Sequence, residues 1–122
     1  MARVTIPVLY MDKRNGLTVP VTSAALFTAI DASDGGAFDM SGRDDKTVIF
    51  VQNAATSAKT VTFKAGNGIQ GVCDLEASVP ASSTVPVVLD SGRFKNVSGE
   101  DKGKVIVTGA SADIKLAVVV LP

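Results

Sequence analysis

The chain has 122 residues, the length of one ordinary domain, and its 12 basic residues balance its 12 acidic residues. A hydrophobic content of 46% excludes an intrinsically disordered chain. The zero net charge, without a cluster of Lys or Arg, argues against a nucleic-acid partner. No apolar run is long enough to cross a bilayer, so we expect no membrane partner either.

The N-terminal stretch alternates apolar residues with others. Val4, Ile6 and Val8 recur at every second position, which is the period of a strand with one buried face. Pro7 has no backbone N–H to donate, and this favours an edge strand over a central one. We therefore predict that residues 1–16 form an N-terminal arm or an edge strand. The stretch has no secretory cleavage site, so synthesis in a cytoplasm is expected.

The next segments are shorter and less regular. Residues 15–16 (Asn-Gly) predict a turn, residues 17–21 a second short strand, and residues 24–30 either a strand or one helical turn. Residues 31–36 (DASDGG) predict a loop. Its aspartates offer the oxygen ligands that Ca²⁺ takes, but their spacing does not match a regular calcium loop, and turn chemistry accounts for Asp beside Gly.

The clearest strand signals lie in the middle of the chain. Residues 46–52 (KTVIFVQ) and 60–64 (TVTFK) are rich in β-branched residues, and the polar residues 53–59 join them. We predict that the two strands form a hairpin. In the second strand Val61 and Phe63 are expected to face the core, because they alternate with polar residues.

The second half of the chain repeats this pattern. Residues 75–79 and 84–89 predict strands, and Pro86 places the latter at an edge or a bulge. Residues 104–108 and 114–121 predict a second hairpin. Its last residues must lie in a covered central strand or against another subunit, because an exposed run of this kind aggregates. Between these strands lie a Gly-rich loop at 65–74 and a charged, exposed excursion at 91–102.

These elements define the expected fold class. About seven or eight short strands at roughly ten-residue spacing predict an all-β, antiparallel β-sandwich or jelly roll, with residues 1–122 forming a single domain. Its core is expected to include the large apolar side chains Phe38, Phe50, Phe63 and Leu89.

The residues needed for common catalytic chemistry are missing. The sequence has no His and one Cys, so it cannot build a Ser-His-Asp triad, a Cys-His pair or an ordinary zinc site. Residues 66–71 match G-x-G-x-x-G, but no helix pattern follows, so we interpret them as a loop. We predict no enzyme activity, no catalytic residue, no cofactor and no metal.

Two residues allow alternative interpretations. Cys73 fits a small, buried or half-buried hydrophobe, with an intermolecular or reactive thiol as the alternative. Phe94 lies between Arg93 and Lys95 in a charged segment. It either anchors an interface together with Arg93 or folds back to cap the sandwich.

Several stretches of the chain together resemble a known family. They are GAFDMSGRDDKTVIFVQN at 36–53, T-V-T-F at 60–63, S-V-P-A at 78–81, S-G-R-F-K-N at 91–96, and K-V-I-V-T followed by I-K-L-A-V-V-V-L at the end. Over residues 25–122 the chain resembles small virion proteins of tailed bacteriophages, which are regarded as head or decoration proteins.

The resemblance implies a passive structural function. The protein would be made in the host cytoplasm and bind the outer surface of the assembled head, with the major capsid protein lattice as its partner. It would be a homo-oligomer, with a trimer favoured. The segment 2–10 would act as an arm that adds a strand to a neighbouring sheet. The expected interface residues are Val4, Ile6, Val8, Tyr10, Arg93 and Phe94. Two alternatives remain: a tail or head–tail connector component, and a carbohydrate- or surface-binding β-sandwich module.

Overall fold

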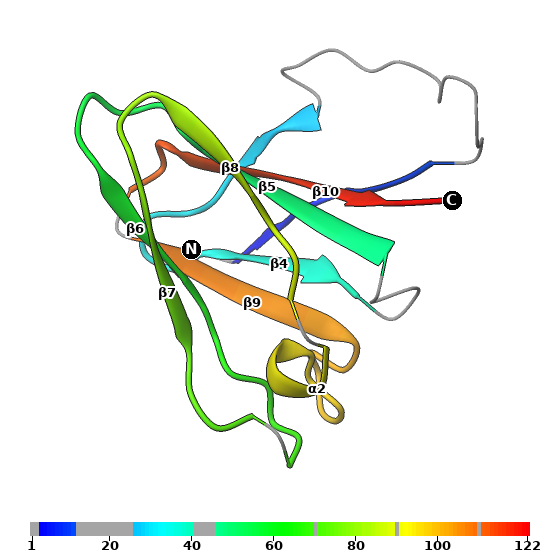
Figure 1. The fold of residues 1–122 in the computed structure, drawn as a ribbon. Coiled ribbons are helices and arrows are strands. Elements are labelled where there is room, and N and C mark those ends of the chain that lie inside the picture. Colours follow the sequence, from blue (N-terminus) through cyan, green and yellow to red (C-terminus); the bar gives the residue numbers. More distant parts are fainter. Residues whose placement is uncertain (1–2, 12–25, 41–45, 70, 90, 110) are drawn as a thin grey trace.

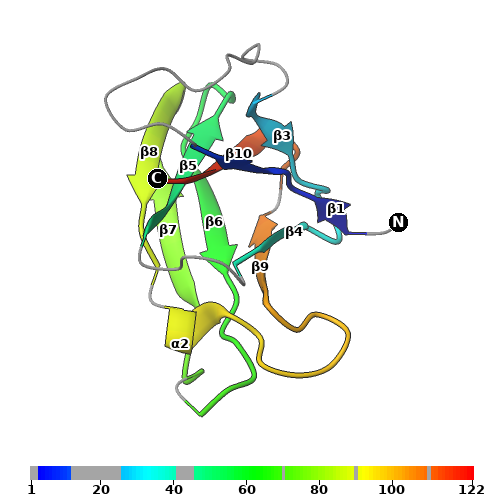
Figure 2. The same ribbon diagram turned by 90° about the vertical axis from the view of Figure 1, so that its right-hand side faces the viewer.

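The computed structural model describes residues 3–11, 26–40, 46–69, 71–89, 91–109 and 111–122. Within these ranges nearly all regular structure is β, and two sheets pack face to face (Figures 1 and 2). The elements are β1 (Val4–Thr5), β2 (Val8–Tyr10), β3 (Thr28–Ala29), β4 (Gly36–Asp39), β5 (Thr47–Asn53), β6 (Lys59–Phe63), β7 (Leu75–Val79), β8 (Ser83–Val87), the one-turn helix α2 (Ser91–Phe94), β9 (Lys104–Gly109) and β10 (Ile114–Val120).

The prediction of an all-β sandwich is confirmed, but the sheets are mixed rather than purely antiparallel. We call the sheet with strand order β1-β4-β9-β6-β7 sheet A. Sheet B has the order β2-β10-β5-β8, and β3 also pairs with β10. The pairs β1–β4 and β2–β10 are parallel. Both involve the N-terminal segment, which reaches its partners through long connections, and only such connections permit parallel pairing.

The two predicted hairpins do not exist as such. β5 lies in sheet B and β6 in sheet A, so the link between them crosses from one sheet to the other. The same holds for β9 in sheet A and β10 in sheet B. Alternation within a strand fixes which side chains face inward, but it does not select the neighbouring strand. The strands were therefore placed correctly along the chain and paired wrongly.

The core lies between the inner faces of the sheets. Val61 and Phe63 point inward as predicted, and Phe38 and Leu89 are also buried. Phe50 was wrongly assigned to the core. Ile49 and Val51 on either side of it are buried, so Phe50 points to the outer face of sheet B and is half-buried there.

The remaining strand predictions have mixed outcomes. Pro86 lies in β8, an edge strand of sheet B, as its missing N–H requires. β10 is a central strand between β5 on one side and β2 and β3 on the other, so the apolar C-terminal run is covered. Thr28–Ala29 is a strand. The turn at 15–16 and the strand at 17–21 lie outside the described residues.

Candidate interaction surface

The N-terminal segment closes one side of the sandwich. β1 lies on β4 of sheet A, and β2 lies on β10 of sheet B, so the chain crosses between the sheets at Ile6 and Pro7 (Figure 2). The Ile6 N–H donates to the Ala37 carbonyl at 2.8 Å, and its side chain is only 2% exposed. Residues 4–10 are therefore edge strands of their own domain in this structure.

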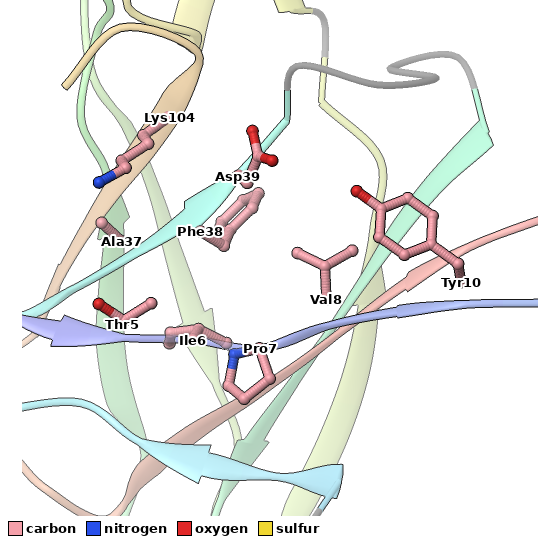
Figure 3. Close-up of a pocket in the computed structure, with 9 residues that line it drawn as sticks. All are labelled: Thr5, Ile6, Pro7, Val8, Tyr10, Ala37, Phe38, Asp39 and Lys104. Atoms are coloured by element: carbon pink, nitrogen blue, oxygen red, sulfur yellow. The ribbon is translucent and has the colours of Figure 1, made fainter.

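A pocket lies beneath this crossing. It has a volume of about 290 Å³ and mostly apolar walls. Asp39 and Lys104 are opposite each other in the β4–β9 register, and the Tyr10 side chain lies beside Val8 (Figure 3). The lining residues are Thr5, Ile6, Pro7, Val8, Tyr10, Ala37, Phe38, Asp39 and Lys104.

The four N-terminal interface candidates thus have different environments. Ile6 is a core residue and cannot offer its side chain to a partner. Val4 and Val8 are half-buried, and Val8 packs against the core. Tyr10 is exposed.

A second region stands out at the end of the sandwich where α2 lies, and we call it the loop end. It consists of the Gly-rich segment 64–74, α2 and the segment 95–103, which lie together in both ribbon views (Figures 1 and 2). Asn67 joins the segments. Its backbone N–H donates to Asn96 Oδ1 at 3.2 Å, its Oδ1 accepts the Val97 N–H at 2.8 Å, and its Nδ2 donates to the Ser98 carbonyl at 3.0 Å.

The base of the Gly-rich segment is also fixed. Lys64 Nζ donates to Asp74 Oδ2 at 2.7 Å, and the Ala65 N–H donates to Asp74 Oδ1 at 2.7 Å. The hydrogen bond from Lys64, followed by that from Ala65, lowers the pKa of the Asp74 carboxyl. The segment is therefore held where it leaves β6 and where it enters β7.

The glycines of this segment are explained by close packing of backbone. A Cβ on Gly71 would collide with the Gly66 carbonyl, and one on Gly66 would lie 2.5 Å from the Lys95 carbonyl oxygen. The Gly66 N–H donates to the Arg93 carbonyl at 2.8 Å. Gly66 therefore lets this segment approach the backbone at Lys95, and Gly71 lets it fold back onto Gly66, in agreement with the interpretation of G-x-G-x-x-G as a loop.

The loop end exposes several apolar side chains. Ile69 is fully exposed, Val72 is 82% exposed and Val97 is 53% exposed. Ile69 and Val97, together with Gly68 and Gly92, line a shallow depression of about 460 Å³. Exposed apolar side chains on loops that are fixed by hydrogen bonds make the loop end a candidate interaction surface among the described residues.

Sequence reasoning missed this surface. The segments 65–74 and 91–102 were interpreted as separate exposed loops, and the hydrogen bonds between them join residues about thirty positions apart. One signal was present in the sequence. Ile69 and Val72 are large apolar residues in an otherwise small and polar loop, and they belong to no strand period.

The structure distinguishes the two interpretations of Phe94 and corrects that of Cys73. The Phe94 side chain is 2% exposed and belongs to the core, so Phe94 caps the sandwich and does not anchor an interface. The Arg93 guanidinium lies 5.0 Å from the centre of its ring, and Arg93 Nη2 donates to Cys73 Sγ at 3.5 Å. Cys73 is exposed, so its interpretation as a buried or half-buried hydrophobe was wrong. It lies in the Gly-rich segment, where backbone packs on backbone and the Cys73 side chain stays outside.

The Asp31 carboxylate stabilises the turn of the 31–36 loop itself. Asp31 Oδ2 accepts the N–H groups of Ser33 at 3.0 Å and Asp34 at 2.7 Å. Within the described ranges no three His, Cys, Asp or Glu side chains lie close enough together to hold a metal ion.

The comparisons with known proteins add no relative. No protein-family model, curated protein or solved structure that was compared with the chain matches it. In the part of the chain that the structure describes, no helix is both long and apolar enough to span a membrane.

Proposed function

We propose that this chain is a structural protein of a tailed-phage virion, which binds the outer surface of the assembled capsid and stabilises it through its loop end. One observation carries the choice of surface. Ile69, Val72 and Val97 expose apolar side chains on segments that Asn67 holds together. The resemblance of residues 25–122 to head and decoration proteins supports the choice of partner.

Such a surface costs little conformational entropy when it binds, because its loops are already held in place. Binding normally loses affinity when loops and side chains become fixed at the interface. Here the Val97 N–H and the Ser98 carbonyl are already hydrogen-bonded to Asn67. The loop therefore loses less conformational entropy when a partner binds. Burying the exposed apolar side chains on the capsid then contributes about 25 cal/mol per Å². Many small apolar contacts of this kind, repeated over the capsid lattice, stabilise the shell even when each copy has a small interface.

In this proposal the N-terminal segment stays packed on its own domain and does not act as a detached arm. Its hydrogen bonds and the buried Ile6 side chain tie it to its own domain. Releasing it would expose the core. The loop end can contact a partner with the fold intact, and this favours it over the segment 2–10 as the capsid-binding surface.

The proposal is tested by co-sedimentation with assembled capsids from the protein's own source. Wild-type protein is expected to pellet with capsids and not with free capsid subunits. The triple variant Ile69→Ser, Val72→Ser, Val97→Ser should weaken binding at least about tenfold, because about 1.4 kcal/mol of lost apolar burial suffices for that factor. Leu121→Ser is the matched control, since Leu121 is an exposed apolar residue outside the loop end.

Two results would contradict the proposal in different ways. Wild-type protein that stays in the supernatant overturns the capsid function, and binding to isolated tails or to a glycan array would then favour one of the two alternatives. Capsid binding that survives the triple variant overturns the choice of surface alone.

A further inference from the structure

The edges of the two sheets differ in how well they are protected against pairing with another chain. In the described residues sheet A ends at β1 and β7, and sheet B ends at β8 and at β2 and β3 beside β10. β1, β2 and β3 are two or three residues long, and β8 contains Pro86. Short strands and proline are the usual devices that prevent edge pairing. β7 spans five residues and has neither Pro nor Lys.

The backbone groups that β7 turns outward can be identified from the neighbouring strands. The Lys64 N–H donates to the Ile106 carbonyl of β9 at 2.8 Å. Since backbone groups alternate in direction along a strand, the even-numbered residues of β6 face β9 and the odd-numbered ones face β7. In the β6–β7 register these odd residues are opposite Leu75, Ala77 and Val79. The N–H and C=O groups of Glu76 and Ser78 therefore point away from the sheet.

These outward groups restrict how a second β7 can pair with the first across a twofold axis. A register centred on Glu76 places two carboxylates opposite each other, which is unfavourable. A register centred on Ser78 places Glu76 opposite Pro80, which has no N–H. A register centred on Ala77 places each Glu76 opposite a Ser78 of the second copy. Both pairs then exchange N–H···O bonds, and all four outward N–H groups find acceptors.

The side chains of β7 agree with the register centred on Ala77. The two Ala77 residues form a pair without direct backbone hydrogen bonds, where strands approach most closely and a small side chain fits best. On the same face Leu75 is opposite Val79 of the second copy. Val79 is fully buried within its own copy, so of the two only Leu75, which is 37% exposed in the single chain, has apolar surface that the second strand can cover.

We infer that two copies of this chain associate through β7 in antiparallel register about Ala77, which joins their A sheets into one continuous sheet. The same patch serves on both copies, as a twofold interface requires. This association does not depend on the loop end and goes beyond the proposed capsid binding.

The test is sedimentation velocity of the purified protein between about 10 μM and 1 mM, a range that covers weak dimers. The wild type is expected to show a concentration-dependent dimer. Ser78→Pro removes an outward N–H without touching the β6 pairing, so it should give a folded monomer, with the fold checked by circular dichroism. Ser78→Ala retains the N–H and should retain the dimer.

Charge at position 78 tests the register itself. Ser78→Lys places an ammonium opposite Glu76 of the second copy and should tighten the dimer roughly two- to tenfold, because two cross-strand pairs improve. Ser78→Glu should weaken it by a similar factor. Thr60→Lys and Thr60→Glu are matched controls, since Thr60 lies beside Ser78 on the interior strand β6. They should shift the dissociation constant much less.

Three results would overturn the inference. The first is a wild type that remains a monomer at the highest concentration. The second is a dimer that Ser78→Pro leaves intact. The third is a trimer, the state implied by the resemblance, because a twofold pairing of identical edges closes at two copies.

Discussion

At each end of strand β6 an asparagine side chain hydrogen-bonds neighbouring segments together. The two ends differ in which side chains are exposed to solvent around that asparagine. At the Lys59 end, Asn53 is fully buried, and its Nδ2 lies 2.9 Å from the Ser57 carbonyl and 3.0 Å from that of Val79. At the Phe63 end, Asn67 is exposed and holds the segment 96–98. The first asparagine joins the two sheets, and the second joins two loops.

The surroundings of the two asparagines explain the difference in role. Around Asn53 the connecting residues are small or polar, and Ala54, Thr56 and Ser57 are exposed. Around Asn67 the exposed residues include Ile69, Val72 and Val97. A hydrogen bond contributes most where its loss leaves a buried group without a partner. We therefore expect the Asn53 end to determine stability and the Asn67 end to determine recognition.

The largest effect on stability is expected from Asn53→Ala. This change leaves the Val79 carbonyl and the Ala55 N–H without their side-chain partner, and it opens space at a buried position. We expect the free energy of unfolding to fall by about 2–4 kcal/mol, measured by urea denaturation.

Gln52→Ala is the control for this prediction. Gln52 is the half-buried neighbour on the outer face of β5, so its replacement should change the free energy of unfolding by less than about 1 kcal/mol. If both variants lost the same free energy, the special role of Asn53 between the sheets would be disproved.

A smaller effect is expected from Asn67→Ala. Its two side-chain hydrogen bonds are exposed, and water replaces them when they are lost, so the free energy of unfolding should fall by about 1 kcal/mol or less. Amide hydrogen exchange at Val97 should become faster, because its N–H loses the Oδ1 acceptor. Asn67→Asp retains that acceptor and should preserve more of the protection. Unchanged exchange in Asn67→Ala would show that Asn67 does not hold the loops together.

The contrast between the ends of β6 also shows which features the sequence could predict. The strands β6, β7, β9 and β10 were located to within a residue or two, β6 and β7 by alternation of apolar and polar residues and β9 and β10 by their runs of β-branched and apolar residues. Pro86 correctly predicted an edge position for β8, because a residue without a backbone N–H disfavours a central strand. Such local causes can be recognised without knowing which strands are neighbours.

Other features depend on partners that are distant in the sequence. The links after β5 and after β9 cross between sheets, and nothing in their short polar sequences separates this path from a hairpin. Asn53 looked like the first residue of a polar link, but it is the buried end of β5. The loop end depends on hydrogen bonds from Asn67 to residues 96–98, and these gave no local pattern.

A pH dependence is expected at the loop end. The pKa of Asp74 is lowered from its ordinary value of 3.8, mainly by the hydrogen bond from Lys64. A lowered pKa in the folded state stabilises the fold above the unfolded value, and this contribution is lost as the pH falls through the folded value. The wild type should therefore lose more stability than Asp74→Asn between about pH 5 and pH 2.

Thermal unfolding of both proteins across this pH range provides the measurement. The difference between their midpoints should be small, because the pair is exposed and screened by solvent. It should also shrink when salt is added. Two curves that remain parallel down to pH 2 would show that the hydrogen bonds of Asp74 do not contribute to stability.

The smallest effect on stability is expected from Ile69→Ser. This variant best distinguishes a role in stability from a role in recognition. The Ile69 side chain is fully exposed, so its removal takes no apolar area out of the core and should move the unfolding midpoint by less than about 0.5 kcal/mol in free energy. Partner binding should nevertheless weaken, because the same side chain lines the depression beside Val97. A midpoint that fell as far as in Asn53→Ala would show that Ile69 packs within its own chain. The loop end would then stabilise the fold, as the Asn53 end of β6 does.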